Sequence, residues 1–73
     1  MDKKLMILML ADSGLDTAVN FLNANALATE AKAKLETDPA KQKEILKSAA
    51  KDREVAKILK AADAAIEAYL FPI

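Results

Sequence analysis

The chain has 73 residues, of which 53% are hydrophobic and 30% are charged, and its formal net charge is zero. This length allows one small domain, residues 1–73, near the lower limit for a self-sufficient core. The chain has no His and no Cys, so the commonest catalytic bases, thiol nucleophiles and transition-metal ligands are missing. A neutral chain also gives no electrostatic reason to expect nucleic acid or an anionic membrane as a partner.

The first predicted element is a short helix over residues 3–12. It begins after Asp2, which supplies an N-cap. It contains the unbroken apolar run "LMILML" at residues 5–10, in which only Ile7 is β-branched. A strand is the alternative, because periodicity alone does not assign short apolar runs. No A-x-A cleavage site follows, which argues against a signal peptide, and the run is shorter than the ~20 apolar residues of a membrane span.

The second predicted helix covers residues 16–36, after a break in "ADSGLD" where Gly14 is expected to end the first helix in a left-handed conformation. It has two apolar sides. One side holds Leu15, Ala18, Val19, Leu22 and Ala26, and the other holds Phe21, Ala24, Leu27, Ala28, Ala31 and Leu35. A helix with two apolar sides is central or contacts two neighbours.

The remaining sequence predicts two more helices, over residues 39–51 and 53–70. Asp38 and Pro39 are a typical N-cap and first helical residue. The apolar stripe then changes direction by about 150° around the helix near Asp52, which favours a new helix capped by Asp52, although one kinked helix remains the alternative. The expected fold is therefore all-α, a small bundle of four helices (about 3–12, 16–36, 39–51 and 53–70) with short loops.

The sequence offers no convincing chemical site. Ser13 and Ser48 are the only serines and have no histidine to activate them. Asp16, Asp38 and Asp52 are explained as helix caps, and a single Gly excludes a phosphate-binding loop. Residues 32–60 carry an excess of basic side chains without interleaved aromatics. We therefore expect no enzyme activity, no catalytic, cofactor-binding or metal-binding residue, no small-molecule substrate, and neither nucleic acid nor membrane as a partner.

The number of large apolar residues instead favours an interface. Leu, Ile, Val, Met, Phe and Tyr number 23, more than so small a domain can enclose. A homo-oligomer buries the surplus, and a dimer is expected because two-fold dimers are the commonest closed form, with higher cyclic symmetry as the alternative. The candidate interface residues come from the opening run and the C-terminus: Leu5, Met6, Ile7, Leu8, Met9, Leu10, Phe71 and Ile73.

The segment "TDPAKQKEILKSAAKDREVAKILKAADAAIEAYL", residues 37–70, combines an Asp-Pro helix start, Lys/Glu surfaces, Ala-rich seams and minimal loops. In these habits it resembles computationally designed helical proteins. The resemblance implies a self-assembling symmetric oligomer without a substrate, and it gives no cellular compartment beyond soluble cytoplasmic expression in a recombinant host. The alternative is a natural helical binding module, such as a small phage or bacterial adaptor that grips another protein's helix.

Overall fold

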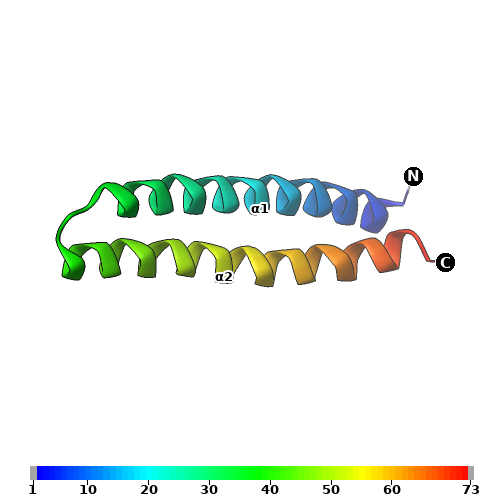
Figure 1. Cartoon of the computed structure of the whole chain (residues 1–73). Helices are drawn as coiled ribbons and strands as arrows, with labels where there is room; N and C mark the ends of the chain where they lie inside the picture. The colour runs from blue at the N-terminus through cyan, green and yellow to red at the C-terminus, as the bar shows by residue number, and fades with distance from the viewer. Residues whose placement is uncertain (1, 73) are drawn as a thin grey trace.

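A computed structural model describes residues 2–72 as two long antiparallel helices, α1 (Lys3–Leu35) and α2 (Pro39–Leu70), joined by residues 36–38 (Figure 1). The hairpin is a rod with extents of 55 × 16 × 15 Å, and both chain ends lie at the end opposite the connection. The all-helical prediction is confirmed, but the prediction of a four-helix bundle is wrong, because the expected breaks near Gly14 and Asp52 do not occur.

The helix starts follow the capping residues in the sequence. The Asp2 side chain accepts a hydrogen bond from the backbone nitrogen of Lys4 at 2.9 Å, and the Asp38 side chain accepts one from that of Ala40 at 3.0 Å. Pro39 is the first residue of α2. A backbone N–H at this position would have no hydrogen-bond partner within the helix, so the N–H that proline lacks is not needed. The predicted starts at residues 3 and 39 and the predicted end at residue 70 therefore agree with the structure.

Gly14 does not end a helix, because α1 continues through "ADSGLD". Gly14 is not in the left-handed conformation, and the Thr17 hydroxyl donates back to the carbonyl of Ser13 at 3.1 Å. A Gly inside a helix costs only about 1 kcal/mol relative to Ala. Since α1 packs along α2 on both sides of this point, packing overrides the local preference.

Asp52 does not cap a new helix either. It lies inside α2, and its carboxylate accepts a hydrogen bond from the Asn25 side chain of α1 at 2.7 Å. The change of direction in the apolar stripe does not mark a boundary, because the second part of the stripe includes Val55 and Ile58, which are exposed. The buried face of α2 runs straight through Asp52.

The two helices meet along what we call the inner seam, whose residues recur at alternating steps of three and four. In α1 it consists of Leu8, Asp12, Leu15, Val19, Leu22, Ala26, Thr29 and Ala33, and in α2 of Gln42, Ile45, Ala49, Asp52, Ala56, Leu59, Asp63, Ile66 and Leu70. Every other residue of α2 is exposed. This seven-residue repeat is the spacing of a two-stranded coiled coil.

Small side chains form the most buried part of this seam. Ala26, Ala33, Ala49 and Ala56 are at most 4% exposed, and no large side chain within residues 2–72 is fully buried. Near the connection, the Gln42 side chain donates to the carbonyl of Ala33 at 3.0 Å, which also accepts from the backbone N–H of Glu36 at 3.2 Å. The thin alanine core leaves most large apolar side chains with exposed surface.

Candidate functional site

A second apolar row, which we call the outer stripe, runs along α1 on the side away from α2. Each member lies two positions after a place in the three-and-four spacing of the inner seam. Two positions correspond to a rotation of about 200° around the helix. The members are Ile7, Leu10, Gly14, Thr17, Phe21, Ala24, Ala28, Ala31 and Leu35, and all are exposed. The outer stripe has the same steps of three and four as the inner seam and contains no charged residue, which is typical of a helix that packs against two neighbours.

The equivalent positions of α2 have a different character. They begin with four charged residues, Glu44, Lys47, Lys51 and Glu54, and become apolar only from Ile58 onward. Charged side chains on an outward face are ordinary solvent contacts. The outer stripe of α1 is therefore the continuous candidate surface for a partner.

The structure divides the predicted interface residues between two faces. Ile7 and Leu10 belong to the outer stripe and are 62% and 69% exposed, whereas Leu8 is half-buried in the inner seam. The remaining described members, Leu5, Met6, Met9 and Phe71, are all classed as exposed, and Ile73 lies outside the described residues. Ile7 and Leu10 of the N-terminal run are thus one end of a stripe that continues to Leu35.

By length and composition, α1 is also the one helix in residues 2–72 that could cross a membrane. An 18-residue window of it has a mean hydropathy of 1.4, and none of that window is buried in the hairpin. Core helices of soluble proteins and signal sequences share this length and composition. The carboxylates of Asp12 and Asp16 on the same helix oppose a span, since charged groups inside a bilayer are costly.

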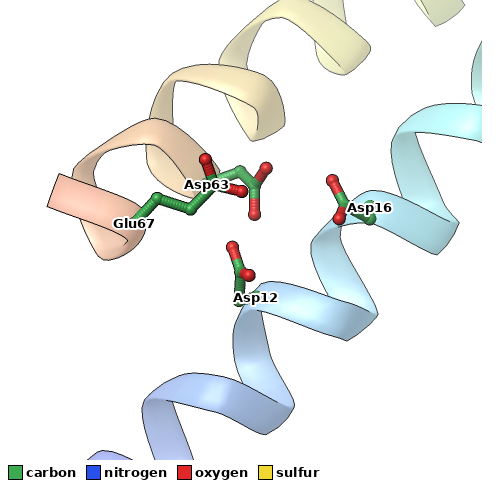
Figure 2. Close-up of side chains that lie close together, drawn as sticks. All are labelled: Asp12, Asp16, Asp63 and Glu67. Carbon is green, nitrogen blue, oxygen red and sulfur yellow. The ribbon is translucent and has the colours of Figure 1, made fainter. Parts of the chain in front are cut away.

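Four carboxylates meet across the gap between the helices, and we call them the acidic cluster. Asp12 and Asp16 come from successive turns of α1, and Asp63 and Glu67 from successive turns of α2 (Figure 2). One oxygen of each residue lies within 4.8 Å of the corresponding oxygens of the other three. Asp63 is only 8% exposed, and among residues 2–72 neither its Oδ1 nor the buried Oδ1 of Asp12 has a hydrogen-bond partner.

Two acids of this cluster, Asp16 and Asp63, have pKa values raised above the ordinary value. The pKa of Asp63 is raised above 3.8 by two main causes. The larger is a hydrogen bond with the Asp12 carboxyl, which requires a shared proton, and the second is burial. Asp63, as a hydrogen-bond partner and as a like charge, in turn raises the pKa of Asp16. Capping does not explain Asp16, contrary to the sequence-based expectation, because Asp16 lies inside α1.

A different pair of charges links the middle of the hairpin. Arg53 of α2 donates from Nη2 and Nε to the two carboxylate oxygens of Glu30 in α1, at 2.6 and 3.2 Å. The hydrogen bonds from Arg53 lower the pKa of Glu30. Within residues 2–72 this is the only ion pair with a basic nitrogen within 4.0 Å of a carboxylate, so no basic side chain neutralises the acidic cluster.

A shallow groove of about 560 Å³ lies beside the inner seam. Val19, Asn23 and Ala56 line it together with the basic side chains of Arg53, Lys57 and Lys60. Comparisons with family models, with curated proteins and with solved structures each found no match for this chain.

Proposed function

We propose that this protein is a structural module whose function is self-assembly, and that two copies pair through the outer stripes of their α1 helices. No chemical reaction is part of this function. The observation that carries the proposal is the outer stripe itself: nine uncharged, exposed residues along the whole length of α1 with the spacing of a coiled-coil seam. Such a surface on a small chain is typical of an interface.

The order of residues in the stripe favours a second copy as the occupant. At seven-residue steps it reads Ile7, Gly14, Phe21, Ala28 and Leu35, which is large, small, large, small, large in both directions. Two antiparallel copies related by a two-fold axis beside Phe21 therefore present the same pattern to each other. Self-complementarity of this kind is what a two-fold interface requires.

The dimensions of the hairpin agree with this occupant. The outer stripe follows α1 along a hairpin 55 Å long, and a standard protein interface buries roughly 800 Å² per partner. Fully burying a Phe, Leu or Ile side chain contributes about 1.5–3 kcal/mol. Phe21 and Leu35 are 69% and 84% exposed in the single chain, so pairing removes much apolar surface from water.

The test is the oligomeric state of three proteins, measured by light scattering on a sizing column and by sedimentation equilibrium at micromolar concentrations. We expect the original chain to be a dimer and Phe21→Lys to be a monomer, because the substitution places two charges beside the two-fold axis. Ile58→Lys is the matched control: Ile58 is 63% exposed at the equivalent position of α2. It should leave the dimer intact.

Two results would contradict the proposal. A Phe21→Lys variant that remains a dimer would show that the outer stripe is not the interface. An original chain that stays monomeric as its concentration rises would show that another occupant covers the stripe. If that monomer then floats with phosphatidylcholine vesicles, the occupant of the stripe is a membrane. If it does not float, the remaining occupant is the helix of another protein.

A further inference from the structure

The second unusual feature of the hairpin is the position of two acids in its inner seam. Asp12 and Asp63 occupy seam positions, and seven residues away the same positions hold Val19 in α1 and Ala56 in α2. Apolar side chains are the ordinary occupants of such positions, and a polar one reduces stability unless a partner satisfies it. Within residues 2–72, neither helix places a hydrogen-bond donor on Oδ1 of Asp12 or of Asp63.

The burial of Asp63 makes this missing donor important. With 8% of its surface exposed, Asp63 is removed from most solvent, and its Oδ1 accepts no hydrogen bond. The Oδ1 of Asp12 is buried and unpartnered in the same way. Figure 2 shows the Asp12 and Asp63 side chains pointing toward each other across the gap between α1 and α2, with Glu67 beside Asp63 and Asp16 to one side. A positive charge in this gap would satisfy both oxygens.

The spacing of the oxygens suits a metal ion. The four carboxylates form two i,i+4 pairs that face each other, an arrangement in which like charges repel. Oxygens bound to one Ca²⁺ at 2.3–2.6 Å are at most about 5 Å apart, and these four lie within 4.8 Å of one another. All the donors are carboxylate oxygens, which are ligands that suit hard cations such as Ca²⁺, Mg²⁺ and Mn²⁺.

We propose that Asp12, Asp16, Asp63 and Glu67 bind one divalent cation of the calcium class and thereby join α1 to α2 near the open end of the hairpin. Ca²⁺ is favoured over Mg²⁺, because four protein carboxylates must replace water that Mg²⁺ releases reluctantly. All four ligands come from one chain. The site is therefore independent of self-assembly, and it should be present in the monomeric Phe21→Lys variant as well.

The test measures cation binding by calorimetry and the thermal midpoint by circular dichroism, on full-length protein stripped with a chelator and held at pH 7. We expect one Ca²⁺ per chain, weaker binding of Mg²⁺, and a thermal midpoint that rises with millimolar CaCl₂. Asp63→Asn should weaken Ca²⁺ binding at least tenfold and remove the rise. It should also raise the midpoint of the cation-free protein, since it relieves repulsion, so a folding defect would not be mistaken for lost binding.

Asp52→Asn is the matched control. Asp52 is also a seam carboxylate of α2, but its partner is the Asn25 side chain rather than another acid, and an amide oxygen can still accept that hydrogen bond. This variant should bind Ca²⁺ as the original chain does. Absence of binding to the original chain, unchanged binding to Asp63→Asn, or an equal midpoint rise in NaCl of the same ionic strength would each overturn the proposal.

Discussion

Gly14 lies in the interior of α1 with ordinary helical backbone geometry, so nothing in the fold requires a glycine there. A Cβ atom built on it meets no atom within 4 Å. The residue therefore keeps the entropic cost of glycine without using its conformational freedom.

Gly14→Ala should stabilise the hairpin by about 1 kcal/mol, because Ala loses less backbone entropy than Gly on entering a helix. Urea unfolding followed by circular dichroism measures the change. The comparison is best made in the Phe21→Lys background, where self-association does not contribute to the measured free energy. A loss of stability would contradict the uninterrupted path of α1 through residue 14.

The aspartates show what residue-level analysis can and cannot predict. Asp38 was correctly predicted as an N-cap, because Pro39 after it leaves no other interpretation. Asp16 and Asp52 were wrongly given the same role, since Asp favours caps in general and neither position has a following proline. The acidic cluster escaped prediction because its members are distant in sequence and meet only once α1 and α2 pair.

At the scale of the helices, the inner seam depends on small residues at seven-residue intervals. Ala26 and Ala33 of α1, and Ala49 and Ala56 of α2, allow the helices to approach closely. The apolar stripe predicted for residues 53–70 departs from this seam, because it includes exposed residues such as Ile58. A period of 3.5 follows the seam along both helices, and supercoiling absorbs the difference.

Ala49→Leu should destabilise the hairpin by about 1–3 kcal/mol, because Ala49 is fully buried and a larger side chain must push the helices apart. The matched control is Ala50→Leu, the same change at the neighbouring exposed position. Urea unfolding of both variants gives the comparison. Equal stability of the two would show that α1 and α2 do not approach closely at Ala49.

The Glu30–Arg53 pair predicts a dependence of stability on pH. Hydrogen bonds from Arg53 lower the pKa of Glu30 in the folded chain, so this stabilisation is present above the ordinary value of 4.5 and is lost as the pH falls through the lowered value. Glu30→Gln should therefore reduce the unfolding free energy slightly at pH 7 and by less at pH 3. Glu44→Gln, which changes an exposed acid of α2, should show no such trend. A loss of unfolding free energy in Glu30→Gln that increases as the pH falls would contradict the prediction.

At the scale of the molecule, the helical class and the outer termini of the helices could be predicted from composition and caps, but the number of helices could not. The sequence between residues 11 and 16 and that around Asp52 both resemble helix boundaries. Only the continuous packing of one helix along the other decides that neither is a boundary. The two apolar sides predicted for residues 16–36 do correspond to the inner seam and the outer stripe.

The two chain ends leave the rod together, and the turn at residues 36–38 stands at its far end, in a molecule 55 Å long. Inserted into a surface loop of another protein, the hairpin would project from its host as a spacer, because entry and exit are side by side. In the antiparallel dimer that we propose, two such host proteins would be held at opposite ends of the two paired hairpins. The separation of the hosts would then be fixed by helix length rather than by a flexible linker.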